Sequence, residues 1–310
     1  MVVKLGNAAV HIGPAGWSYE DWEGTVYPDA KPKGFRPPAF LAQYFNTIEL
    51  NNTFYRPPSP GFCYRWLKDV ADRPDFLYTA KLWQGFTHEQ EIGGEEGPAA
   101  AEAGPPAEVR SGGRRRGRWA QRDVEAFRNG IAPLVQAGRL GALLMQFPWS
   151  FRYSAQNEGY LRELADEFSD LPLVLEVRHK GWVQPEALRF VESLGIGFCN
   201  IDQPAFRDNI PLTTHAFGPV GYLRLHGRNA ETWFAKDAGR DARYDYTYKP
   251  QELDELQAAL EEIAARVERM FVIANNHYRG QAVATGLQLM QRLTGERMEP
   301  PGRIGELYGV

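Results

Sequence analysis

Eight short apolar runs, each followed by a longer segment, recur along the chain and restrict the folds that it can adopt. The runs span 11–17, 46–51, 76–82, 142–147, 173–178, 196–202, 221–227 and 270–276. Their length and apolar content are typical of buried strands. Most of the segments between them, such as "QPEALRFVESLG", carry apolar residues at helical spacing. This alternation predicts a parallel sheet whose strands are connected by helices.

Eight such units favour a single (β/α)8 TIM barrel, an α/β fold, over an open doubly wound sheet. No GxGxxG follows the first run, so the nucleotide-binding fingerprint of the open sheet is absent. The segment 203–220 contains three prolines and has no helical period. We therefore expect one TIM-barrel domain over residues 1–310, with an irregular connection between strands six and seven.

A flexible low-complexity insertion is predicted at 89–121, in the loop after the third strand. Its central part, 92–118, is rich in Gly, Ala, Pro and charged residues and has no apolar period. It includes the run Arg114, Arg115 and Arg116. These arginines could contact phosphate or an acidic partner, or could simply be solvated.

Charge and hydropathy disfavour several classes of protein. The formal net charge is −4, so no overall positive field attracts nucleic acid, although a nucleic-acid partner stays possible. No window approaches the roughly 18 apolar residues that a membrane helix requires, which predicts a cytoplasmic protein without a membrane partner. Cys63 and Cys199 form no CxxC motif, so neither a disulfide framework nor a structural zinc is expected.

Polar residues stand at the carboxyl ends of seven of the predicted strands. In a barrel these ends converge on one face, where the site is built. Three strands carry two polar residues at alternate positions, and hence on one strand face: Glu49 and Asn51, Glu176 and Arg178, and Arg224 and His226. The alternative is a buried ion-pair network whose only role is to pair the charges inside the barrel, because buried charges must be paired in any case.

These residues divide into three groups by chemistry. One carboxylate could be held neutral by burial and the other kept ionised by a neighbouring cation, which suits acid/base catalysis. The candidate catalytic residues are Glu49, Glu176, Lys81 and His226. The candidate substrate-binding residues are Trp17, Asn51, Tyr55, Gln146, Arg178, Asp202, Arg224, Asn275, Asn276 and His277. The candidate phosphate-binding residues, in the loops after strands seven and eight, are Arg228, Arg279 and Gly280.

Two other kinds of site are less consistent with the sequence. Glycoside hydrolysis needs two carboxylates, but common barrel glycosidases place them after strands four and seven, where this chain has Gln146 and Arg224. A metal site could draw on several carboxylates and histidines, but no HxH, HExxH or DxD spacing occurs. We expect no metal and no cofactor, and a metal-dependent phosphoesterase remains an alternative.

Several motifs together resemble the YecE-like family (domain of unknown function seventy-two). They include "IGPAGWSYEDW", "YFNTIELNNTFYR", "LLMQFPWSF", "LVLEVRHKGW" and "FVIANNHYRGQAVATG", and the resemblance extends from about Val10 to Leu293. It implies a single TIM barrel and no settled activity. The leading hypothesis is an enzyme that acts on a small polar substrate, sugar-like or phosphorylated. The rival is a non-catalytic protein that binds a nucleotide or single-stranded nucleic acid through its aromatic rings and arginines.

Overall fold

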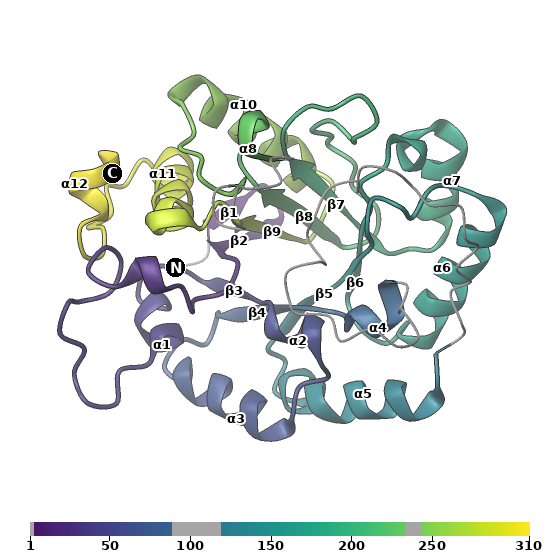
Figure 1. Cartoon of the computed structure of the whole chain (residues 1–310), viewed down its shortest axis with the longest axis horizontal. Coiled ribbons are helices and arrows are strands. Elements are labelled where there is room, and N and C mark those ends of the chain that lie inside the picture. The colour runs from purple at the N-terminus through teal and green to yellow at the C-terminus, as the bar shows by residue number, and fades with distance from the viewer. Residues whose placement is uncertain (1–2, 89–118, 234–242) are drawn as a thin grey trace.

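The parallel strands that the sequence predicts are all present. The computed structural model describes residues 3–88, 119–233 and 243–310 (Figure 1). The predicted strands are β2 (Ala8–Pro14), β3 (Thr47–Leu50), β4 (Leu77–Lys81), β5 (Leu140–Gln146), β6 (Leu173–Glu176), β7 (Gly197–Asp202), β8 (Val220–Leu225) and β9 (Arg269–Ala274). Together with β1 (Val3–Leu5), an unpredicted strand antiparallel to β2, they form within the described residues one sheet of order β1-β2-β9-β8-β7-β6-β5-β4-β3.

The six predicted helices are present, and the structure adds others that the sequence did not predict. The expected helices are α1 (Pro37–Leu41), α5 (Gln121–Gln136), α6 (Ala155–Glu167), α7 (Pro185–Ser193), α10 (Pro250–Ala264) and α11 (Gln281–Thr294). The sequence reading missed α3 (Pro60–Asp69), and it missed the C-terminal α12 (Ile304–Tyr308). Shorter elements are η1 (Glu20–Trp22), α2 (Asn52–Tyr55), α4 (Gln84–Thr87), η2 (Lys180–Val183), α8 (Ala230–Trp233) and η3 (Tyr278–Gly280).

The two irregular segments have different outcomes. The connection between β7 and β8 contains no helix, as predicted. The insertion predicted at 89–121 lies outside the described residues except for its last three positions, and α5 already begins at Gln121. The arginine run at 114–116 also lies outside them. None of the described helices has the length and apolar character needed to cross a membrane.

The sheet is strongly curled, as one contact across it shows. Arg224 Nη2 on β8 lies 2.8 Å from Glu49 Oε1 on β3, although four strands separate β8 from β3 in the sheet order. In a flat sheet, five spacings of about 4.8 Å would hold these strands roughly 24 Å apart. The chain therefore forms a mixed α/β fold in which these two side chains lie on the concave face of the sheet.

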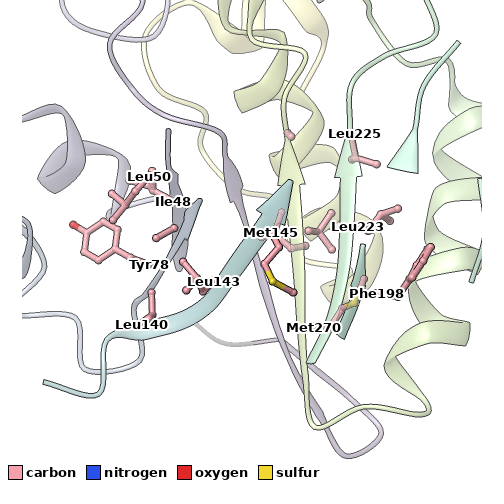
Figure 2. Packing of buried hydrophobic residues seen from close by; sticks show 14 of the residues in the cluster. Ile48, Leu50, Tyr78, Leu140, Leu143, Met145, Phe198, Leu223, Leu225 and Met270 are labelled. Atoms are coloured by element: carbon pink, nitrogen blue, oxygen red, sulfur yellow. The ribbon is translucent and has the colours of Figure 1, made fainter. Parts of the chain in front are cut away.

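Alternation along the strands separates two apolar layers. One layer packs between the sheet and the helices, and Figure 2 shows members of it from β3, β4, β5, β7, β8 and β9. The other layer includes Ala142, Leu144, Tyr222, Phe271 and Ile273, at positions that alternate with the first. Because side chains on a strand point alternately to the two faces, the residues that alternate with the helix-facing layer occupy the concave face.

The edges of β2 and β3 meet along a seam that has few backbone hydrogen bonds. The seam contains one isolated parallel bridge, between Ala15 and Glu49. Nearer the N-terminal ends of the two strands, the Asn46 side chain accepts a hydrogen bond from Ile12 N at 2.8 Å and donates one to Val10 O at 3.0 Å. Gly13 is required here, because a Cβ at this position would lie 1.9 Å from Thr47 O. The Asn46 amide thus replaces backbone groups that a regular ladder would supply.

A buried histidine beside this seam makes stability sensitive to acid. His11 is 3% exposed and stacks on Phe271, with ring centroids 5.0 Å apart. Burial lowers the pKa of His11 to about 4, against a smaller opposing effect of the Asn46 carbonyl. The native ring is therefore neutral, whereas the unfolded chain binds a proton below the ordinary value of 6.5. Its contribution to stability is fully present above pH 6.5 and is lost as the pH falls toward 4.

We expect His11→Phe to flatten this acid dependence. Between about pH 6 and 4.5, the slope of unfolding free energy against pH should be smaller in the variant by about 1 kcal/mol per pH unit. Other buried histidines, such as His226, titrate in both proteins, so the difference between the two slopes isolates His11. Urea unfolding at a series of pH values measures it. Parallel curves for the two proteins would contradict the prediction.

Candidate functional site

A buried group of charged side chains lies at the carboxyl ends of the strands. It consists of Glu49, Lys81, Glu176, Arg178 and Arg224, and is called the charge cluster below. Arg224 bridges the two carboxylates: Nη2 donates to Glu49 Oε1 at 2.8 Å and Nη1 to Glu176 Oε2 at 2.7 Å. All three of these side chains are 0% exposed. Residues from β3, β6 and β8 thus form one ion-pair network.

Further donors supply the remaining hydrogen bonds to the oxygens of the two carboxylates. Arg178 Nη2 donates to Glu176 Oε1 at 2.7 Å, and Tyr222 Oη donates to Glu49 Oε2 at 2.9 Å. Lys81 Nζ lies 3.8 Å from Glu49 Oε1. Each of the four carboxylate oxygens therefore accepts a hydrogen bond. Tyr222 was not identified from the sequence, although it lies two positions before Arg224 and so on the same strand face.

The pKa values of Glu176 and Arg224 are shifted toward their charged forms, and the cluster as defined has more cations than carboxylates. Burial raises the pKa of Glu176, but the nearby Arg224, Arg178 and Lys81 outweigh it and lower the pKa below its ordinary value. Burial lowers the pKa of Arg224, and the two carboxylates outweigh that effect and hold the pKa well above its usual range. Among the described residues, three cations therefore face two carboxylates, and Glu176 is an ionised partner of the arginines.

A neutral histidine adjoins the cluster. His226, just after β8, is 1% exposed, and burial, followed by the charges of Arg178, Arg224 and Lys81, lowers its pKa well below 6.5. Its Nδ1 lies 2.9 Å from Asn275 Nδ2. Because an amide nitrogen only donates, Nδ1 accepts, and the ring proton is on Nε2.

A cavity of about 500 Å³ is lined by residues that follow β2, β3 and β9, and is called the mouth pocket below; none of the five cluster residues lines it. The predicted binding residues that line it are Trp17, Asn51, Tyr55, Asn275 and His277. Its other lining residues include Tyr19, Arg36, Phe62, Arg65 and Trp66, which the sequence reading did not identify. Asn275 lines the pocket and also contacts His226, whose pKa is affected by the cations of the cluster.

The sequence matches one family over almost its whole length. The family model described as "Protein of unknown function DUF72" matches residues 11–304. The chain belongs to this family. The resemblance to the YecE-like family that the motifs indicated is thereby confirmed. The family description assigns no activity, so the functional argument for this DUF72 protein rests on its own site.

Relatives of this DUF72 protein cover nearly all of it. It is 26% identical over 293 residues to the UPF0759 protein YunF of Bacillus subtilis, covering 92% of this chain and 94% of that protein. A DUF72 family protein from Thermotoga maritima, of known crystal structure, is 32% identical, with a TM-score of 0.71 over 92% of this chain and 98% of that one. A DUF72 family protein from Enterococcus faecalis, at 24% identity and a TM-score of 0.75, covers 94% of this chain and 97% of that one and shares the fold.

Several predicted site residues of the DUF72 protein lie away from the cluster. Asp202 is on the helix-facing side of β7, an even number of positions from Phe198, which packs in the helix-facing layer. It accepts hydrogen bonds from Tyr248 Oη at 2.6 Å and Arg228 Nε at 2.9 Å. Arg228 also donates to Glu255 at 2.9 Å. The predicted phosphate ligand Arg228 is thus hydrogen-bonded to two carboxylates and lies 3.7 Å from a third, that of Glu252.

The predicted site residues in the loop after β9 do not all lie on the same side of the sheet. Asn276 faces the helices, where its Nδ2 lies 2.9 Å from both Tyr246 O and Thr285 Oγ1. Arg279 is exposed and its guanidinium lies over the Tyr278 ring. Gly280 has φ 82°, and a Cβ there would lie 2.7 Å or less from Val26 and Ile304, so glycine is needed for the turn. None of these contacts identifies a phosphate site.

The remaining candidate is Gln146, at the end of β5 beside Glu176 in the sheet register. It is 2% exposed, and its Oε1 accepts no hydrogen bond from the described part of the chain. The described residues also contain no group of three or more His, Cys, Asp or Glu side chains placed to hold a metal ion.

Proposed function

We propose that this DUF72 protein is an enzyme that acts on a small polar substrate, sugar-like or phosphorylated, at the charge cluster. The observation that carries the proposal is the arrangement of three cations around two buried carboxylates among the described residues at the strand ends, near a neutral histidine whose partner Asn275 lines a cavity. Fixed cations in a site without water stabilise negative charge that develops during a reaction far better than they do in water.

The contacts favour different roles for the two carboxylates. Glu176 accepts from two arginines and stays ionised, so we propose that it positions Arg178 and Arg224 toward the substrate. Glu49, whose Lys81 contact is only an ion pair at 3.8 Å, is proposed as the carboxylate that exchanges a proton with the substrate. His226, with its proton on Nε2, is proposed to stabilise a developing oxyanion by hydrogen bonding.

We also propose that residues 1–310 form one domain and that its sheet is a closed (β/α)8 barrel. The Ala15–Glu49 bridge, the Asn46 hydrogen bonds and the close approach at Gly13 support closure between β2 and β3. Closure would bring the strand ends into the ring on which barrel active sites are built.

A thermal-shift screen against sugars, sugar phosphates and nucleotides tests the enzyme proposal. A ligand at one hundred times its Kd adds about 2.7 kcal/mol of stability, which raises the Tm by several degrees. We expect a sugar or sugar phosphate to give this shift in the wild type and in the exposed control Arg189→Ala. The shift should disappear in Arg178→Ala, which removes a cluster cation that is 11% exposed.

The ligand that gives the shift is then incubated with the wild-type protein, and its chemical conversion is followed by NMR. Conversion that is lost in Glu49→Gln is the expected result. A ligand that binds in an Arg178-dependent way but is never converted would replace the proposal with the non-catalytic binding protein.

A further inference from the structure

Helix α3 presents an aromatic surface to the mouth pocket. Phe62, Arg65 and Trp66 lie at helical spacing on one face and all line the cavity. The Phe62 and Trp66 rings are stacked, with centroids 6.2 Å apart, and Trp17 meets Trp66 edge-on at 6.1 Å. Phe62 is 37% exposed. Trp66 is only 4% exposed, so the aromatic surface that α3 leaves open to a planar group is that of Phe62.

The charge of the pocket is positive. Two arginines and no acidic residue are among its lining residues in the described part of the chain. Arg36 is paired with Asp69, at 2.8 Å between Nη2 and Oδ2. The Arg65 guanidinium lies 4.3 Å from the centroid of the Phe62 ring, and no described carboxylate lies within ion-pair distance of it. Arg65 is therefore placed to bind an anion beside the aromatic surface.

Two further lining residues, Asn51 and Asn275, lead from the pocket toward the charge cluster, whose own residues do not line the cavity. Asn51 follows β3 two positions after Glu49, and Asn275 lies 2.9 Å from His226. A ligand held by α3 would thus extend along the two amides toward the histidine. The volume of about 500 Å³ lies within the range of small-molecule sites.

We propose that the mouth pocket binds a planar aromatic ring bearing an anionic group, with the ring against Phe62 and the anion at Arg65. That this ring anion is also the substrate rests on the function proposed above. The binding site itself stands on the pocket alone, whether or not the cluster is catalytic.

Isothermal titration of the full-length protein tests the binding site. Four probes are titrated. AMP and 2-naphthoate carry both an aromatic ring and an anionic group, and are called the ring anions; adenosine lacks the anion and ribose 5-phosphate lacks the aromatic ring. We expect a ring anion to bind about tenfold or more tightly than the probes that lack one feature. Phe62→Ala and Arg65→Ala should each weaken that binding by about tenfold. Tyr64→Ala and Lys68→Ala, exposed positions of α3 that do not line the pocket, should leave it unchanged.

The outcomes separate this inference from the proposed function. Equal binding of all probes, no binding of either ring anion, or binding insensitive to Phe62→Ala and Arg65→Ala would overturn the ring-anion site. The enzyme proposal would still stand if a sugar phosphate gave an Arg178-dependent shift. The converse result is a ring anion whose binding depends on Phe62 and Arg65 but not on Arg178, while no ligand is converted. That result would retain the binding site and reject the enzyme proposal.

Discussion

Arg224→Met is expected to lower the free energy of unfolding by about 3–5 kcal/mol, because it removes one partner from a fully buried ion-pair network. Glu49 and Glu176 would then face each other without the cation that separates them, and each would lose a hydrogen bond of 2.7–2.8 Å. Methionine fills a similar volume, so the loss reports mainly the charge. Urea unfolding measures it, and the Tm should fall by about 6 °C or more.

The matched control for this prediction is Arg207→Met, the same substitution at an exposed arginine. We expect it to change stability by no more than about 0.5 kcal/mol. A loss for Arg224→Met as small as that of the control would show that the buried carboxylates do not depend on this guanidinium. The result would contradict the charge cluster as described, and the roles proposed for it.

Asn46→Ala is expected to cost about 2–5 kcal/mol, because two buried backbone groups lose their partners at the β2–β3 seam. The amide hydrogen of Ile12 loses its acceptor and the carbonyl of Val10 loses its donor. Urea unfolding gives the cost. Hydrogen exchange gives its location, since the Ile12 amide should exchange faster than amides of the central strands.

Gln43→Ala is the control for the seam, since Gln43 lies three residues earlier and is exposed. We expect it to be nearly neutral. If Asn46→Ala were also nearly neutral, and Ile12 exchange unchanged, the Asn46 side chain would not be what holds β2 against β3. The support for a closed barrel would then be reduced to one bridge and the close approach at Gly13.

Much of the fold was predictable because its signals are local. Short apolar runs and amphipathic segments identified all eight parallel strands and six of the helices. Helix α3 was missed because Gly61, Tyr64 and the short length of the segment weaken its apolar period, although Ser59 and Pro60 are a usual helix start. That omission had a functional consequence, since α3 supplies Phe62, Arg65 and Trp66 to the mouth pocket.

The candidate site was predicted only in part, and strand alternation explains which part. Glu49, Glu176 and Arg224 were expected at the strand ends and do meet there. Asp202 was expected with them, but an end position is not sufficient. Its side chain points to the helices, where Arg228 and Tyr248 bind it. Applying alternation to every strand would have excluded Asp202 and Asn276 and included Tyr222.

The sequence by itself determined which segments form strands, which residues share a strand face and that charged residues stand at the strand ends. These properties depend on neighbours a few positions apart. Only the tertiary structure decided that Arg224 pairs with Glu49, 175 positions away, and that α3 lines the pocket beside them. Such contacts depend on how tightly the sheet curls and how each helix packs on it. Curvature and packing arise from many side chains acting together, so no short stretch of sequence encodes them.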